Sequence, residues 1–320
     1  MKYQIKKLNI NNFDIFYQNK LNARSYFIPY KDKELLRTKT VLDERYGSDM
    51  VSVLSGEWKF KYYKKISRLP SVIDTDSVVF DTVSVPSTWQ RTGYEPPCYL
   101  NTRYEFPMNL PNVPDDMSCG VYVRKFNISE SSVNPIVTFL GVCSSLTLYV
   151  NGEYVGYSEG SHNSAEFALK NFVTTGENEL LVIVSKWCNG TYLECQDMFR
   201  ENGIFRDVYI TENPEKYIYD YHIKTDKTGE KYTLSVDVTL KVDTSEQMTI
   251  EVHFLSTDVT VEKVLDTSKK QSIEDAIKRI NKELIEAQRS IDQLENAGVD
   301  VDSLQSALDS VKEELSLIHI

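Results

Sequence analysis

Residues 187–210 read WCNGTYLECQDMFRENGIFRDVYI and are the most informative stretch of the chain. The dipeptide Asn202-Gly203 is a turn signal, because both residue types accept the positive φ that tight turns require. The alternation of apolar and polar residues over 204–210 predicts a half-buried strand directly after the turn. The stretch therefore predicts an irregular loop that ends on a β-strand.

The loop before that turn combines acids, an amide and aromatic rings. Its polar and aromatic side chains are Tyr192, Glu194, Gln196, Asp197 and Phe199. Acceptors for hydroxyl protons beside a flat apolar surface are the chemistry that binds a sugar. The alternative is a polar loop whose carboxylates pair with Arg200 and Arg206, and chemistry alone favours this alternative.

The order of the residues resembles a known family. Residues 193–208 are similar to the signature Leu-Glu-Asp-Gln-Asp-Met-Trp-Arg-x-Ser-Gly-Ile-Phe-Arg-Asp-Val of bacterial β-galactosidases of glycoside hydrolase family two, with Cys195, Phe199 and Asn202 as departures. Further segments agree with the family in the same order: LSGEWKF at 54–60, VPSTWQ at 85–90, PCYLNTRYEFP at 97–107 and VNGEYVGY at 150–157. The resemblance covers roughly residues 20–262.

Composition bounds the class of protein. The 36 basic and 47 acidic residues give a net charge of −11, which argues against nucleic acid or an anionic membrane surface as a partner. There is no apolar run long enough to span a bilayer and no apolar core of a signal peptide at the N-terminus. The 5 cysteines follow no metal spacing, so reduced thiols in a cytoplasmic protein are the simplest interpretation.

Short strand signals dominate the chain as far as Pro214. Residues 1–45 form a polar arm, and residues 46–213 alternate short strands with turns. The sequence VNG at 150–152 predicts a hairpin, and the apolar run at 180–184 predicts a strand covered on both sides. This pattern predicts a mainly β fold with a β-sandwich, and the family resemblance narrows the sandwich to a jelly-roll sugar-binding domain.

A period of two continues over residues 214–265 in three strand signals. In the family resembled here, this region begins an immunoglobulin-like β-sandwich. Such a sandwich needs about seven strands and about 100 residues, so we expect a truncated domain.

The composition changes near residue 265. All 3 Trp, 20 Tyr, 13 Phe and 10 Pro lie upstream of that point. Residues 266–320 instead have a helical period and predict an α-helical hairpin or coiled coil. The last residues, LSLIHI at 315–320, resemble a translated adaptor from sequencing libraries, so this tail is either an ordinary C-terminus or a foreign segment joined by a chimeric assembly.

The resemblance implies a retaining β-galactosidase that hydrolyses terminal β-galactosides such as lactose. Retaining glycosidases use two carboxyl groups about 5 Å apart. In this family both are glutamates of a (β/α)₈ barrel, which also holds the magnesium ligands, and no alternating series of strands and helices appears here. We therefore expect no catalytic residue and no magnesium ligand in this chain, and an inactive N-terminal fragment of an enzyme that is itself a cytoplasmic homo-oligomer.

The resemblance carries two substrate-binding residues over to this chain. Asn101 corresponds to the Asn that reaches the galactose site, and Asp197 to the Asp that binds the galactose 6-hydroxyl together with a sodium or potassium ion. The alternatives are a turn residue for Asn101 and a surface ion pair for Asp197. A second hypothesis for the whole chain is a non-catalytic carbohydrate-binding or scaffold module fused to a coiled coil.

Overall fold

The computed structural model describes residues 1–38, 45–99, 104–194, 197–228, 231–242, 247–254 and 259–266. The predicted helical hairpin lies outside the described residues, apart from Asp266, and so does Asn101. The described residues form two compact units, Met1–Lys241 and the part that begins at Val242. No helix among the described residues is long and apolar enough to cross a membrane.

The apolar run at 180–184 forms the middle of strand β14 (Gly176–Ser185), and all five of its side chains are fully buried. Alternate residues point to opposite faces of a strand. Leu180, Val182 and Val184 accordingly join one core cluster, whereas Leu181 and Ile183 join a second. The sheet is therefore covered on both faces, as the continuous apolar run predicted.

A seven-stranded antiparallel sheet is built around β14. Its strands in spatial order are β2 (Tyr17–Gln18), β12 (Glu153–Glu159), β11 (Ser145–Val150), β14, β8 (Cys119–Ile128), β4 (Gly56–Tyr63) and β6 (Asp81–Val85). The predicted hairpin joins β11 to β12, and its two turn residues, Asn151 and Gly152, have φ values of 50° and 90°. These positive angles explain why Asn-Gly occupies the turn.

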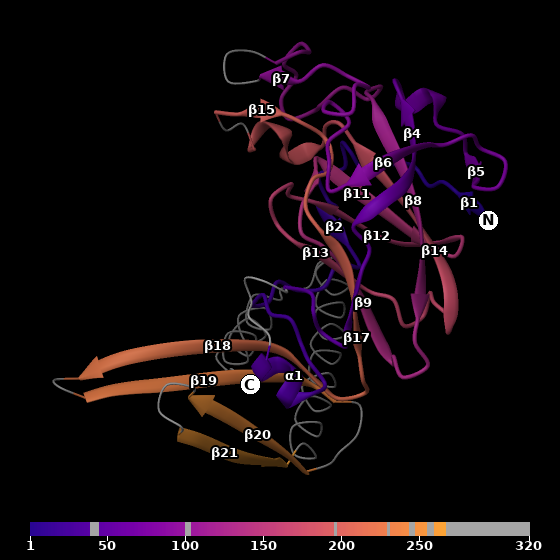
Figure 1. The fold of residues 1–320 in the computed structure, drawn as a ribbon. Coiled ribbons are helices and arrows are strands. Elements are labelled where there is room, and N and C mark those ends of the chain that lie inside the picture. The colour runs from indigo at the N-terminus through magenta and orange to yellow at the C-terminus, as the bar shows by residue number, and fades with distance from the viewer. Residues whose placement is uncertain are drawn as a thin grey trace, which may run out of the picture. The chain divides into compact units, whose positions relative to one another are not determined.

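A four-stranded antiparallel sheet packs against one face of the larger sheet (Figure 1). Its strands in spatial order are β13 (Ala165–Ala168), β9 (Asn134–Phe139), β17 (Val208–Asn213) and β3 (Val51–Val53). The first core cluster takes side chains from both sheets, including Phe139 and Ile210 from the smaller sheet and Val182 from the larger. The architecture is thus mainly β, antiparallel and consistent with a β-sandwich.

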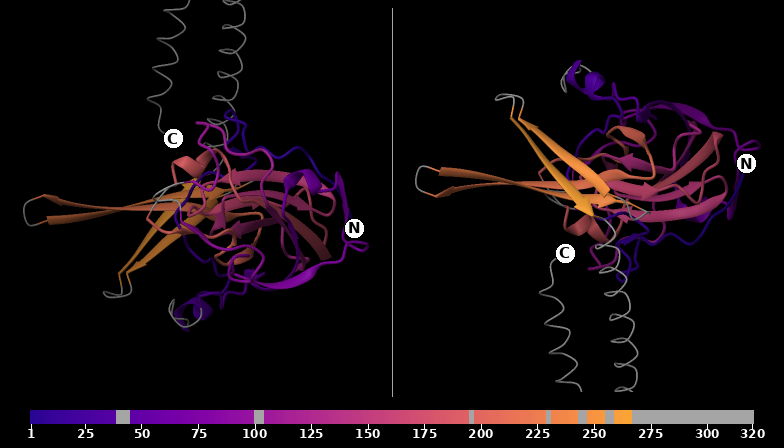
Figure 2. Two further views of the ribbon diagram at one scale, coloured as in Figure 1. Left: turned by 90° about the horizontal axis from the view of Figure 1, so that it is seen from above. Right: turned by 90° about the horizontal axis from the view of Figure 1, so that it is seen from below.

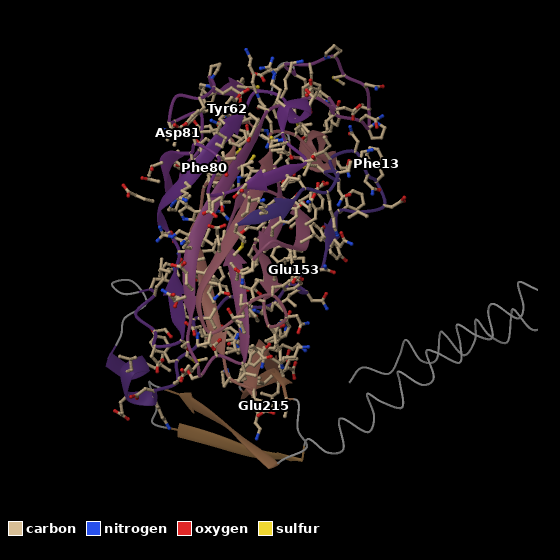
Figure 3. All side chains as sticks on the ribbon, turned by 90° about the vertical axis from the view of Figure 1, so that its right-hand side faces the viewer. Phe13, Tyr62, Phe80, Asp81, Glu153 and Glu215 are labelled. Carbon is tan, nitrogen blue, oxygen red and sulfur yellow. The ribbon has the colours of Figure 1, made fainter. Side chains whose placement is uncertain are left out.

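N-terminal residues cover the other face of the larger sheet. Strand β1 (Lys2–Gln4) pairs with β5 (Val72–Asp74), and the second core cluster contains the fully buried Tyr3 and Ile73. Figure 3 shows Phe13 of this N-terminal segment on the opposite side of the unit from Tyr62 and Asp81. The residues predicted as a polar arm therefore contribute strands and core side chains. The sequence did not reveal this, because the apolar segments of this region are short and follow no period.

The smaller elements lie in the connections between the sheets. They are the helix α1 (Lys33–Thr38), the 3₁₀ turns η1 (Ile66–Arg68) and η2 (Asn189–Tyr192), and the two-stranded pairs β7 (Cys98–Tyr99) with β15 (Phe199–Arg200) and β10 (Val142–Cys143) with β16 (Gly203–Ile204). The prediction of one strand over 204–210 is wrong, because β16 and β17 pair with different strands.

The alternating pattern beyond Pro214 forms strands, as predicted, and they pair antiparallel. In the first unit, β18 (Tyr217–Thr228) pairs with β19 (Lys231–Lys241), and Figure 2 shows this pair as a long two-stranded ribbon in orange. In the second unit, β20 (Gln247–Phe254) pairs with β21 (Val259–Asp266). An immunoglobulin-like domain at 214–265 remains a prediction.

Candidate functional site

The two loops that carry the predicted binding residues meet through a short strand pair. In the pairing of β7 with β15, Tyr99 lies opposite Phe199 and Cys98 opposite Arg200. Asp197 precedes β15 by two residues, and Asn101, outside the described residues, follows Tyr99 by two. The fold thus joins segments that are about a hundred positions apart in the sequence, and Asp197 lies where they join.

Asp197 lies beside an exposed aromatic pair. The Tyr99 hydroxyl donates a hydrogen bond to Asp197 Oδ1. The rings of Tyr99 and Phe199 are 5.6 Å apart between centroids, and the two residues are 39 % and 61 % exposed. A carboxylate acceptor beside exposed rings is the combination that the sequence predicted for sugar binding.

The other aromatic residue of the predicted loop has a structural role. The Tyr192 hydroxyl donates to the Asn112 carbonyl oxygen at 2.9 Å, and its ring packs against Tyr104 at 5.0 Å. Tyr192 also packs against the second core cluster. Tyr192 is therefore partly buried, and Phe199 is the ring of this loop that lies exposed.

The carboxylates near Asp197 do not pair with Arg200 or Arg206 among the described residues. Glu194 accepts hydrogen bonds from the Ser161 backbone N–H at 2.7 Å and from its hydroxyl at 2.6 Å. Arg206 donates to the carbonyl oxygens of Leu140 and His162. The alternative in which these arginines only neutralise the loop carboxylates is therefore wrong for Glu194.

A partly buried ion cluster lies at the base of the β7 loop. Lys186 Nζ lies 2.8 Å from Glu95 Oε1 and 2.7 Å from Glu105 Oε2. Burial acts to lower the pKa of Lys186, but hydrogen bonds and charge from both carboxylates outweigh it, so the pKa is raised. The Cys98 thiol lies beside the same cluster, and burial followed by the hydrogen bond to Glu105 raises its pKa to about 12. These contacts fix the strand that carries Tyr99.

Asn202 and Gly203 fix the segment that follows Asp197. The Asn202 side chain donates to the Lys186 carbonyl oxygen at 2.9 Å and accepts from the Gln90 amide at 2.9 Å, and its backbone N–H donates to Gln90 at 2.7 Å. Gly203 has a φ of 135°, and a Cβ atom there would lie 2.8 Å from the Ser87 carbonyl oxygen. The predicted turn is therefore a buried, hydrogen-bonded segment that admits only glycine at position 203.

A cavity of about 350 Å³ opens beside β15. Its lining residues are Thr88, Arg91, Cys143, His162, Met198, Phe199, Arg200, Glu201 and Phe205. Arg91 Nε lies 3.0 Å from Glu201 Oε2, and the His162 and Phe205 rings are 5.3 Å apart. The sequence singled out neither the cavity nor Arg200 as a binding feature, because the segments that line the cavity meet only through the fold.

The metal expectation rests on Asp197 alone. No group of three or more His, Cys, Asp or Glu side chains that could hold a metal ion occurs among the described residues. One carboxylate and a tyrosine hydroxyl supply at most three oxygen ligands, so the described residues do not by themselves make a complete cation site. A sodium or potassium ion at Asp197 stays a prediction, and no magnesium ligand is assigned.

Comparison with known proteins identifies the family. The family model described as "Glycosyl hydrolases family 2, sugar binding domain" matches residues 51–214. The β-galactosidase of Staphylococcus xylosus is 37 % identical over 232 residues, and that of Actinobacillus pleuropneumoniae is 38 % identical over 212 residues. These matches cover 72 % and 66 % of this chain but only 23 % and 21 % of the two relatives, so the chain spans less than a quarter of their length.

Solved structures share the fold. A β-glucuronidase of Bacteroides uniformis superimposes with a TM-score of 0.52 at 21 % identity, over 67 % of this chain and 26 % of that one. A β-glucuronidase of Ruminococcus gnavus in complex with D-glucuronic acid gives a TM-score of 0.51 at 16 % identity, over 68 % and 38 %. At these identities the likeness concerns the fold.

Proposed function

The chain belongs to the glycosyl hydrolases of family 2, and on that premise we propose that it is the sugar-binding N-terminal part of a retaining β-galactosidase. The observation that carries this proposal is the arrangement at Asp197, where a carboxylate lies beside the exposed rings of Tyr99 and Phe199. The substrate is a terminal β-galactoside of the lactose type, and the sandwich is the family's jelly roll.

Each residue of the site has a defined task in this proposal. The Asp197 carboxylate accepts the proton of a sugar hydroxyl and helps to hold a sodium or potassium ion. The Asn101 amide both donates to and accepts from ring hydroxyls. Phe199 offers an apolar surface to the C–H groups of the sugar, and the hydrogen bond from Tyr99 orients the carboxylate.

We propose no catalytic residue in this chain. Retaining hydrolysis needs an acid/base and a nucleophile about 5 Å apart. Glu194 accepts hydrogen bonds from Ser161 and Glu201 is paired with Arg91, and we assign neither a catalytic task. Hydrolysis then depends on the part of the longer relatives that this chain does not match. The complete enzyme is proposed to be a cytoplasmic homo-oligomer.

Calorimetric titration with a non-hydrolysable thio-β-galactoside tests the proposal. We expect Asp197→Asn to weaken binding by about 10- to 150-fold, because a charge-assisted hydrogen bond contributes about 1.5–3 kcal/mol. The matched control is Asp81→Asn, because Asp81 also accepts a hydrogen bond from a tyrosine hydroxyl, that of Tyr94 at 2.9 Å, outside the site. Equal affinity in wild type and Asp197→Asn would refute the assigned role.

A chromogenic β-galactoside tests the second half of the proposal. We expect the full chain to release no chromophore above a heat-denatured sample, because both catalytic carboxyl groups are proposed to lie elsewhere. Turnover that survives Asp197→Asn and increases with protein concentration would show that this chain holds a catalytic pair of its own.

A further inference from the structure

Phe199 belongs both to the surroundings of Asp197 and to the cavity beside β15. Its ring lies 5.6 Å from that of Tyr99 between centroids, and the Tyr99 hydroxyl donates a hydrogen bond to Asp197. The same Phe199 side chain is 61 % exposed and lines the cavity of about 350 Å³. The cavity and the proposed galactose site are therefore neighbours that share one aromatic side chain.

The polar side chains around the cavity are bonded to one another or buried. Arg91 Nε lies 3.0 Å from Glu201 Oε2, and the Thr88 hydroxyl donates to the same oxygen atom at 3.1 Å. Cys143 is buried, and so are the Nε and Nη2 atoms of Arg200. A polar ligand group placed here would lose its hydration and gain few hydrogen bonds from the described residues, so the cavity favours an apolar group.

Apolar and aromatic side chains form the rest of the lining. They are Met198, Phe199 and Phe205, and the Phe205 ring meets the His162 ring edge to face with the centroids 5.3 Å apart. Met198 is 38 % exposed and Phe205 is only partly buried, so both side chains are accessible to a ligand. Aromatic rings and the methionine thioether pack favourably against a further ring. The volume is in the range of small-ligand sites, and the lining suits a flat apolar group such as phenyl.

We propose that this cavity binds the aglycone of a β-galactoside, the group joined to the anomeric carbon of the galactose, and that it prefers an aromatic aglycone. The inference rests on the proposed function, because the galactose then lies at Asp197 and the aglycone extends across Phe199 into the cavity. The glucose unit of lactose occupies the same place through the C–H groups of its faces. A phenyl group binds there more tightly, because it has no hydroxyl groups to leave without partners.

Calorimetric titrations of the full chain with three non-hydrolysable ligands test the site. The ligands are methyl 1-thio-β-D-galactoside, phenyl 1-thio-β-D-galactoside and phenyl 1-thio-β-D-glucoside. We expect the phenyl galactoside to bind about fivefold more tightly than the methyl galactoside, because only the phenyl group reaches the aromatic lining. Equal affinities for the two galactosides would overturn the inference.

Two variants of the lining locate the aglycone. We expect Phe205→Ala to weaken binding of the phenyl galactoside by about fivefold and to leave the affinity for the methyl galactoside unchanged. Met198→Ala, a change at an exposed side chain, should act in the same direction and replaces Phe205→Ala if that variant does not fold. The matched control is Phe16→Ala, because Phe16 is 51 % exposed and does not line the cavity. This control should leave the preference for the phenyl group unchanged.

The outcomes separate this inference from the proposed function. If the two galactosides bind equally and Asp197→Asn weakens both, the aglycone site is overturned and the galactoside proposal stands. If the phenyl glucoside binds as tightly as the phenyl galactoside, Phe205→Ala weakens both and Asp197→Asn weakens neither, the cavity is supported as a phenyl site and the galactose contact is contradicted. A preference for phenyl that survives both Phe205→Ala and Met198→Ala places the aglycone elsewhere and overturns the site.

Discussion

Two buried arginines, Arg24 and Arg200, make a paired prediction about stability. Replacing Arg24 by methionine leaves Glu166 without its bidentate partner, and Glu166 is 8 % exposed. Breaking one side of a buried ion pair costs about 3–5 kcal/mol of unfolding free energy. Replacing Arg200 by methionine instead removes a buried charge that has no described hydrogen-bond partner. We expect that change to leave the unfolding free energy unchanged or to raise it by about 1–3 kcal/mol.

Urea and thermal unfolding measure the two variants side by side. For a unit of the size of Met1–Lys241, 1 kcal/mol corresponds to about 2–4 °C in melting temperature. Arg24→Met should therefore melt roughly 6–20 °C below wild type, and Arg200→Met at or above wild type. A loss of stability in Arg200→Met as large as that in Arg24→Met would refute the reasoning, because it would show that Arg200 has a structural partner.

Two further predictions concern Gly203, in the segment that follows Asp197, and the buried thiols of Cys98 and Cys119. Gly203→Ala places a Cβ atom 2.8 Å from a backbone oxygen at a φ of 135°, so urea unfolding should show a loss of about 2–4 kcal/mol. Gly176→Ala, with a φ of 90° and open space around the added atom, should lose only about 1 kcal/mol, and equal losses would contradict the close approach at Gly203. Burial raises the pKa values of Cys98 and Cys119 to about 12, with Glu105 contributing at Cys98. Because unfolded thiols ionise near pH 8.5, the unfolding free energy should fall as the pH rises from about 8.5 towards 12, and Cys119→Ala should reduce that fall; a pH-independent urea midpoint over this range would contradict it.

Periodic features of the fold could be predicted because one local pattern specified each of them. The apolar run at 180–184 required a strand with two covered faces, and Asn151-Gly152 required a tight hairpin. The alternation beyond Pro214 required paired strands. In each case the side-chain pattern and the backbone requirement lie within about ten neighbouring residues.

The features that were predicted wrongly depend on which distant strand pairs with the segment. The pattern over 204–210 is the same whether one strand or two run through it, but β16 pairs with β10 whereas β17 pairs with β9 and β3. The Asp207 carboxylate accepts hydrogen bonds from Tyr46 and Ser55 at the break between them. Asn202 is likewise a common turn residue whose burial depends on Gln90, a partner 112 positions away.

Arg200 shows why the candidate site could be predicted only in part. In sequence, Arg200 and Arg206 are equivalent basic residues near the same carboxylates, but Arg206 is exposed and bonded to carbonyl oxygens while Arg200 is buried. A cation buried without a hydrogen-bond partner opposes folding, because it loses its hydration without compensation. Arg200→Met must then keep or raise the unfolding free energy, whereas the same replacement of an arginine with a structural partner would lower it.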